Sequence, residues 1–352
     1  MASKLQQYFP MLRERNELLK EIRSNQQLSD LFDSWLTEQQ EEFLDFCCGA
    51  SGVKMLYDSF FKEILNPEYH PERLNDFLSC LLGMQVKILL VLPNDSTRLG
   101  DENSLVIMDI VVELEDGSII NIEMQKIGYK FPGERCACYS SDLLLRQYRR
   151  VRDEKKKFFN YHDIKPVYTI VLFDESPKEF KSFSNNYMHF FEPLSDTGLQ
   201  LNLLQRYLFI PLDIFKKLMQ NKLIKNKRDA WLLFLSSDNV EDIIYLIKHF
   251  PEFKPMYEEI YSICQNMEDV MGIFSKELQI LDQNTVKYMM DEQQSIIDEQ
   301  KDTINQQNDT INRQNSTIDQ QNNTINQQNS TISDLNAQIA ALKEKLTAME
   351  NQ

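Results

Sequence analysis

The sequence predicts an α/β protein with helical extensions and a C-terminal coiled coil. Two apolar runs between Leu105 and Lys126 flank Glu115-Asp116-Gly117, a turn sequence typical of a β-hairpin. A third apolar run, from Lys165 to Phe173, is short and bounded by Pro and Asp, as expected for a central strand covered on both faces. Residues 291–352 carry a seven-residue Ile repeat, which indicates a coiled coil.

Helical segments are predicted on both sides of this α/β region. Apolar residues recur at three- and four-residue spacing in residues 11–24 and 28–46, where Ser34 and Thr37 are candidate caps. The predicted organisation is a helical arm at 1–65 packed on the α/β domain at 66–215, a helical region at 216–290 with Asp238 and Asn239 as caps, and the coiled coil at 291–352.

Within the α/β domain the pattern predicts a helix, three strands, a helix and a strand. The first helix spans 71–82, with Pro71 in its first turn and Gly83 just past its end. The first strand is 86–92, and the hairpin supplies the next two. The second helix is predicted at 131–152, with these side chains buried: Cys138, Leu143, Leu145, Tyr148 and Val151. The strand at 165–173 is followed by strand-like pieces at 189–193 and 207–215.

The hairpin brings two acidic residues together. Side chains alternate between the two faces of a strand, and a three-residue turn centred on Asp116 places Asp109 opposite Glu123. Their Cβ atoms are then roughly 5 Å apart. Two carboxylates at this distance repel unless a cation or a proton lies between them. The alternative is a pair of solvent-facing carboxylates on an exposed sheet face.

Composition limits the function classes. The formal net charge of −16 argues by itself against a nucleic-acid partner. Residues 146–157, however, carry seven basic residues against two acidic ones. The six cysteines form no CxxC pair, so Cys136 and Cys138 are interpreted as buried free thiols rather than zinc ligands, and a reducing cytoplasm is expected. We expect neither a transmembrane helix nor a signal peptide, because both require an apolar run that is missing here.

The tail has an unusual core pattern. An apolar residue recurs every seventh position, at Ile297, Ile304, Ile311, Ile318, Ile325, Ile332, Ile339 and Leu346. The last heptads add Leu335, Leu342 and Met349, whereas Gln or Asn fills the second core position upstream. This pattern predicts a weak, polar-cored coiled coil that makes the protein a homo-oligomer. An Asn/Gln-rich disordered tail is the alternative.

The order of motifs resembles a known family. Asp109 followed, after a hairpin, by Glu123-Met124-Gln125 is similar to the acidic core of the PD-(D/E)XK nucleases, and more narrowly of the Rpn-type recombination-promoting nucleases, or PD-(D/E)XK family transposases. The resemblance extends from about Tyr57 to Trp231 and includes PERLNDFL, FPGERCACYSSDLLLRQY, KPVYTIVLF and RDAWLLFL. It implies a restriction-endonuclease-like core and a metal-dependent DNA endonuclease with a role in recombination, transposition or mobile elements and phages.

The resemblance also implies residue roles. Asp109, Glu123 and the backbone carbonyl of Met124 would hold a metal ion, and such hard oxygen ligands suit Mg²⁺, with Mn²⁺ or Ca²⁺ as alternatives. Gln125 stands where the superfamily motif has Lys. Other members of this subgroup also have Gln there, so activity is expected, but the general base is left open. Lys126 points to the opposite face of a regular strand and replaces that Lys only if a bulge intervenes.

Each of the remaining candidate site residues has two interpretations. Glu72 matches the first-motif acid, or is simply a first-turn acid favoured by the helix dipole. Arg135 and Tyr139 match a further family motif, and either bind a phosphate or buttress the sheet. The basic run is predicted to contact the DNA backbone through Arg146, Arg149, Arg150, Lys155 and Lys156. The alternative is that these residues form a solvated face.

Two functions follow from these observations. The first is an Mg²⁺-dependent DNA endonuclease. The second is a catalytically weak or inactive nucleic-acid-binding protein that keeps the fold and assembles through its coiled coil. The Asp109/Glu123 pair favours the first, and Gln125 favours the second.

Overall fold

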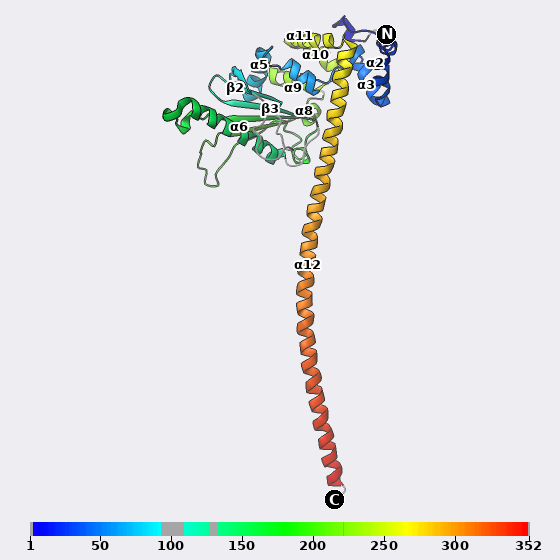
Figure 1. Cartoon of the computed structure of the whole chain (residues 1–352), viewed down its shortest axis with the longest axis vertical. Coiled ribbons are helices and arrows are strands. Elements are labelled where there is room, and N and C mark those ends of the chain that lie inside the picture. The colour runs from blue at the N-terminus through cyan, green and yellow to red at the C-terminus, as the bar shows by residue number, and fades with distance from the viewer. Residues whose placement is uncertain (1–2, 93–108, 127–131, 221, 351–352) are drawn as a thin grey trace. The chain divides into compact units, whose positions relative to one another are not determined.

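The computed structural model describes residues 3–92, 109–126, 132–220 and 222–350. It is a mixed α/β structure built on one six-stranded sheet (Figure 1). The chain divides into two compact units, Met1–Tyr288 and Met289–Gln352. The predicted loop at 93–103 and the predicted strand residues 105–108 lie outside the described residues.

The sheet is antiparallel at both edges and parallel in the centre. Its strand order is β1-β2-β3-β4-β6-β5. The strands β1, β2 and β3 pair antiparallel, β3, β4 and β6 pair parallel, and β5 is an antiparallel edge strand. Their bounds are β1 Ile88–Val91, β2 Ile110–Leu114, β3 Ile119–Gln125, β4 Val167–Phe173, β5 His189–Phe191 and β6 Gln205–Pro211.

Helices precede, interrupt and follow the sheet. Before it lie α1 Arg15–Ser24, α2 Gln26–Asp33, α3 Thr37–Cys48, α4 Asp58–Ile64 and α5 Pro71–Leu82. The crossover helix between β3 and β4 is α6 Pro132–Lys155, and α7 Lys178–Lys181 and α8 Leu212–Met219 flank the later strands. The chain ends with α9 Lys227–Ser236, α10 Val240–His249, α11 Lys254–Ile263 and α12 Met267–Glu350. The order α5, β1, β2, β3, α6, β4 is the predicted order of elements.

The two faces of the sheet are covered differently. Ile120 and Ile122 point into the main core, which extends from Leu5 to Phe274 and includes α5, α9 and α11. The opposite face is covered by α6 (Figure 1), whose Tyr139 and Leu143 pack against sheet residues. Both faces of the central strands are therefore buried, as predicted for the run at 165–173.

The hairpin has the predicted turn and register. Gly117 has φ +86°, a left-handed conformation that glycine adopts without the clash a Cβ would cause. Its N–H donates to Leu114 O at 2.9 Å, which closes the three-residue turn. Ile110 pairs with Ile122 and Val111 with Asn121, so the next position outward places Asp109 opposite Glu123.

The predicted buried face of α6 was partly wrong: Leu143 is buried, and Tyr148 and Val151 are half-buried, but two of the five residues are not buried. Cys138 and Leu145 are exposed, whereas Cys136, Tyr139, Ser140, Leu143 and Gln147 are buried. The sheet face beneath α6 contains polar groups, so the covering helix face is partly polar too. Gln147 illustrates this, because it donates to Gly117 O at 3.0 Å and accepts from Lys165 N at 2.7 Å. A search for apolar periodicity alone misses such a face.

Two local predictions also needed correction. The strand predicted at 207–215 ends at Pro211, which has no N–H to continue a ladder, and α8 starts at Leu212. In the N-terminal arm, Ser34 follows the end of α2, and Leu36 rather than Thr37 is the N-cap of α3. The predicted cap at Asn239 is confirmed, because its Oδ1 accepts from Glu241 N at 2.8 Å.

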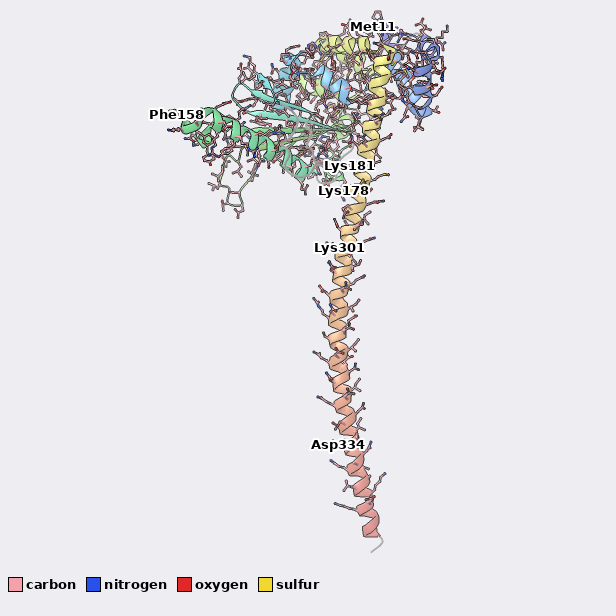
Figure 2. The ribbon with its side chains drawn as sticks, in the orientation of Figure 1. Met11, Phe158, Lys178, Lys181, Lys301 and Asp334 are labelled. Atoms are coloured by element: carbon pink, nitrogen blue, oxygen red, sulfur yellow. The ribbon has the colours of Figure 1, made fainter. Side chains whose placement is uncertain are left out.

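The C-terminal unit is helical. It belongs to α12, which is continuous from Met267 to Glu350, in contrast to the disordered alternative. Figure 2 shows its side chains standing out along the helix, with Lys301 and Asp334 labelled. The heptad isoleucines from Ile297 to Ile339 are each 49–55% exposed. A single helix cannot bury this apolar row.

Candidate active site

The acidic pair lies on the sheet face that α6 covers. Glu123 is 4% exposed, and its neighbours on the same face, Asn121 and Gln125, are 0% and 3% exposed. Asp109 directly precedes the first residue of β2, and its side chain is 17% exposed. The alternative of two solvent-facing carboxylates is therefore excluded.

Each carboxylate has one polar partner from β3. Met124 N–H donates to Asp109 Oδ2 at 2.7 Å, and Asn121 Nδ2 donates to Glu123 Oε1 at 2.9 Å. These two bonds orient the carboxylates without neutralising either of them. The backbone of Met124 consequently lies beside Asp109, where the resemblance places a metal-ligating carbonyl.

The pair is electrostatically strained when no cation is bound. Burial, and then the charge of Asp109, raises the pKa of Glu123 to about 8. Burial also raises the pKa of Asp109, although the bond from Met124 N–H and the charge of Lys62 act in the opposite direction. A divalent cation between the two groups would remove this penalty.

A lysine that the sequence analysis missed stands next to Asp109. Lys62 Nζ lies 3.6 Å from Asp109 Oδ1 and 2.9 Å from Asp58 Oδ1, so α4 brings both a cation and an acid to the site. A cleft of about 450 Å³ opens here and is lined by Lys62, Glu68 and Asp109, among others. Nothing in the local sequence around Lys62 indicates this contact, because 46 residues separate it from Asp109.

The residues next to Glu123 face in different directions. Gln125 is buried on the Glu123 face, and among the described residues neither end of its amide has a hydrogen-bond partner. Lys126 faces away, as expected for a regular strand, and pairs with the buried Glu277 of α12. Lys126 is thus paired away from the site, and Lys62 supplies positive charge beside Asp109.

The two family-motif residues on α6, Tyr139 and Arg135, have different surroundings. Tyr139 is 3% exposed and packs with Val111 and Leu143, which buttresses the sheet. Arg135 lies over the Tyr139 ring, with its guanidinium carbon 5.2 Å from the centroid. Arg135 is also near Glu123, and its positive charge lowers the pKa of Glu123, against the effect of burial.

The other predicted site residues lie apart from the acidic pair. The side chain of Glu72 is 69% exposed, and His70 Nδ1 lies 3.4 Å from it. None of the described contacts of Glu72 reaches Asp109 or Glu123. Cys136 is buried near Glu123, whereas Cys138 is exposed. The expectation of buried thiols therefore holds for Cys136 and not for Cys138.

The basic run is only partly available to a ligand. Arg150 pairs with Glu113 at 2.6 Å, Arg146 with Asp142 at 2.7 Å, and Lys155 with Asp163. Arg149 and Lys156 are exposed. The run ends beside Phe158, which is 89% exposed and is labelled in Figure 2.

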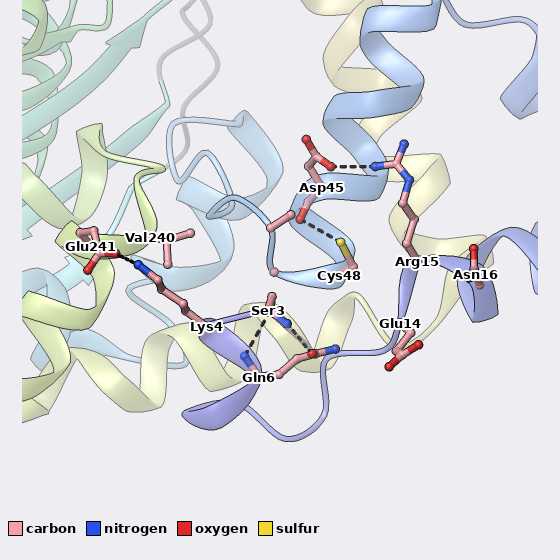
Figure 3. A pocket seen from close by; sticks show the side chains of 12 residues that line it. Ser3, Lys4, Gln6, Glu14, Arg15, Asn16, Asp45, Cys48, Val240 and Glu241 are labelled. Atoms are coloured by element: carbon pink, nitrogen blue, oxygen red, sulfur yellow. Dashed lines mark hydrogen bonds and ion pairs between the residues drawn. The ribbon is translucent and has the colours of Figure 1, made fainter. Parts of the chain in front are cut away.

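A second cavity, of about 640 Å³, lies at the N-terminal arm (Figure 3). Four of its charged groups form two ion pairs: Lys4 with Glu241, and Arg15 with Asp45 at 2.8 Å. Figure 3 shows these pairs across the cavity. The cavity offers no acidic pair comparable with Asp109 and Glu123.

The donor set fits a hard divalent cation. Asp109 and Glu123 supply carboxylate oxygens, and both amide atoms of Gln125 are buried without a hydrogen-bond partner among the described residues. Within the described part of the chain, no three His, Cys, Asp or Glu side chains gather to hold a metal ion. A metal at this site would therefore keep several waters, which is typical of Mg²⁺.

The raised pKa values make the metal-free protein pH-sensitive. Glu123 stays protonated in the fold up to about pH 8, whereas in the unfolded chain it ionises near its ordinary value of 4.5. The unfolding free energy should therefore fall as pH rises from about 4.5 to about 8, by a few kcal/mol in total. Urea denaturation in EDTA between pH 5 and 9 measures this. Glu123→Gln should flatten the dependence and be more stable than wild type at pH 8, and an unchanged pH dependence in this variant would contradict the assignment.

Comparison with curated proteins and with solved structures finds no match. None of the described helices combines the length and apolar character needed to cross a membrane. A family model described as PD-(D/E)XK nuclease family transposase matches residues 55–299, well over half of the chain and a range that includes both site carboxylates, α4 and α6. The chain therefore belongs to the PD-(D/E)XK nuclease family transposases.

Proposed function

We propose that the protein is a metal-dependent DNA endonuclease that hydrolyses phosphodiester bonds and acts in recombination, transposition or mobile-element and phage biology. The observation that carries the proposal is the burial of Asp109 and Glu123, opposite each other across one hairpin, where their mutual repulsion favours a bound cation. PD-(D/E)XK nucleases generally use divalent metals. We propose Mg²⁺ as the ion, with Mn²⁺ or Ca²⁺ as alternatives.

The residues around the pair have separate roles. Asp109, Glu123 and the Met124 carbonyl hold the ion, which when bound neutralises phosphate charge and makes a water easier to deprotonate. Lys62 supplies positive charge to the scissile phosphate, because it already stands 3.6 Å from Asp109 in the cleft. Gln125 orients the attacking water through its amide, which no described residue satisfies, since it cannot carry the charge of the usual Lys.

Arg135 and the exposed basic residues in the last turns of α6 and directly after it serve DNA binding in this proposal. Arg135 lies near Glu123 and can reach a phosphate next to the scissile one. Glu72 lies outside the cleft, and the acidic residue that lines the cleft with Asp109 is Glu68. The pairing of Arg150 and Lys155 with acids leaves Arg149 and Lys156 as the contacts with the DNA backbone.

A plasmid assay tests the proposed function. Supercoiled plasmid incubated with the full-length protein should become open-circular or linear in Mg²⁺ and stay supercoiled in EDTA. A protein that binds the plasmid without cutting it in Mg²⁺, Mn²⁺ or Ca²⁺ would support the second function, a non-catalytic assembly protein. Gln125 is the observation that favours this alternative.

Neutralising the exposed basic residues should weaken DNA binding for all sequences. Each lost phosphate contact lowers the slope of log K against log salt by roughly 0.9, so Arg149→Gln/Lys156→Gln should lower it by roughly 2. A fluorescence anisotropy titration at several salt concentrations measures the slope. The charge-matched control is Lys20→Gln/Lys248→Gln, on exposed positions of α1 and α10 that are remote from α6 in sequence. Equal slopes in the two double variants would show that the run is only a solvated face.

We also propose that residues 291–352 assemble with the same segment of a second copy. The exposed isoleucines repeat every seven residues, so two identical helices in register bring the same apolar positions together. Gln and Asn at the other core position weaken the seam but restrict the register, because a slip would place amides against Ile.

A further inference from the structure

Glu277 is a buried carboxylate outside the proposed metal site. It lies in the first turns of α12, where it is 2% exposed. Its two oxygens have different partners: Oε1 accepts from Ser59 N at 3.0 Å, and Oε2 pairs with Lys126 Nζ. Lys126 Nζ also lies 5.0 Å from the centroid of the Tyr57 ring. The carboxylate of Glu277 is thus enclosed by the protein, and the side chain of Lys126 is 9% exposed.

These partners belong to the two elements that build the proposed site. Lys126 directly follows Gln125 at the end of β3, three residues from Glu123. Ser59 is the second residue of α4, and the same helix carries Lys62 one turn later. Glu277 therefore joins the catalytic strand to the helix that presents Lys62 to Asp109.

Stability alone does not account for this ion pair. Burying two charges costs about as much as their attraction returns, and apolar residues of similar size often serve equally well. The start of α12 is already anchored by Phe274, whose ring lies 4.9 Å from the ring of Trp35 and 5.4 Å from that of Phe43. The particular contribution of Glu277 is the fixed acceptor that it offers to the Ser59 amide.

We propose that Glu277 is a positioning residue for the nuclease reaction: by accepting from Ser59 N with its buried carboxylate, it fixes the start of α4 and so sets Lys62 at Asp109. The inference rests on the proposed function and extends it to a residue that touches neither metal nor DNA. The helix that supplies Glu277 is the same helix whose distal part carries the Ile heptads.

Two double variants separate positioning from stability. Lys126→Met/Glu277→Gln removes both charges but keeps an acceptor for Ser59 N, whereas Lys126→Met/Glu277→Leu removes the acceptor as well. We expect the Gln double variant to cut plasmid at a kcat close to that of wild type. We expect the Leu double variant to lose about tenfold or more in kcat with an unchanged KM, because a small displacement of a catalytic group has effects of this order.

Hydrogen exchange provides a readout that does not depend on cleavage. Exchange over residues 58–62 should be faster in the Leu double variant than in the Gln double variant, with similar exchange elsewhere in the first unit. Equal kcat values and equal α4 exchange in the two double variants would overturn the proposal. An inactive wild-type protein would instead refute the proposed function, and the exchange comparison would still decide whether Glu277 fixes α4.

If the double variants do not fold, Glu277→Asp gives the same comparison. It keeps the buried charge paired with Lys126 but shortens the side chain by one methylene, which draws the carboxylate away from Ser59 N. A lowered kcat with an unchanged KM and faster α4 exchange is expected. Wild-type kcat and wild-type exchange in Glu277→Asp would contradict the positioning role.

Discussion

Asp109→Asn and Glu123→Gln should each reduce plasmid cleavage in Mg²⁺ by roughly 10³-fold or more while leaving the fold intact. Both replacements keep the size of the side chain and an oxygen that accepts from Met124 N–H or Asn121 Nδ2. Each would remove a charged ligand of the proposed metal ion, and a bound metal contributes several kcal/mol of charge stabilisation in the transition state. Initial rates of nicking under excess plasmid measure the effect.

The matched control is Glu115→Gln, in the turn of the same hairpin. Glu115 is exposed and pairs with Lys87, so its replacement removes one acidic charge without touching the site. It should cut at close to the wild-type rate. Wild-type rates in both site variants would show that the acidic pair is not the catalytic centre.

Deleting residues 291–352 should convert an oligomer into a smaller species without unfolding the first unit. The main core lies entirely within residues 5–274, so the deletion leaves it complete. The deletion removes the row of half-exposed isoleucines, each of which contributes about 1.5–3 kcal/mol when fully buried against a partner helix. Light scattering at micromolar concentration, with circular dichroism as the folding control, measures both outcomes.

Two further variants locate the assembly within the tail. Ile332→Lys/Ile339→Lys, in the heptads with apolar residues at both core positions, should dissociate the full-length protein. Ile304→Lys/Ile311→Lys, in the polar-cored heptads, should have a smaller effect. Full-length protein should make paired breaks, because oligomerisation brings two sites to one DNA, and the deleted form should mainly nick. A monomer mass for the full-length protein would end the coiled-coil proposal.

The local features of the site could be predicted from the sequence. Turn chemistry and strand alternation together determine a hairpin register, because a slip by one residue would turn every apolar side chain to the wrong face. The opposition of Asp109 and Glu123 followed from that register, and the pairing of Ile110 with Ile122 confirms it. The direction of Lys126, away from Glu123, followed from the same alternation.

The surroundings of the site could not be predicted in this way. The burial of Glu123 depends on α6, whose inner face includes Ser140 and Gln147 and therefore gives a weak apolar signal. The arrival of Lys62 at Asp109 depends on how α4 packs against the sheet. Contacts between residues so distant in sequence come from tertiary packing, and no local pattern encodes them.

Mn²⁺ binding measured by isothermal titration calorimetry tests the central claim most directly, because it asks whether the Asp109/Glu123 pair holds a metal ion independently of any DNA substrate. The wild-type protein at pH 8 should bind Mn²⁺ at this site and release protons, since metal ligation requires Glu123 to ionise. Glu123→Gln should lose both the binding and the proton release, and Glu115→Gln should retain them. Equal Mn²⁺ affinity in wild type and Glu123→Gln would contradict the account.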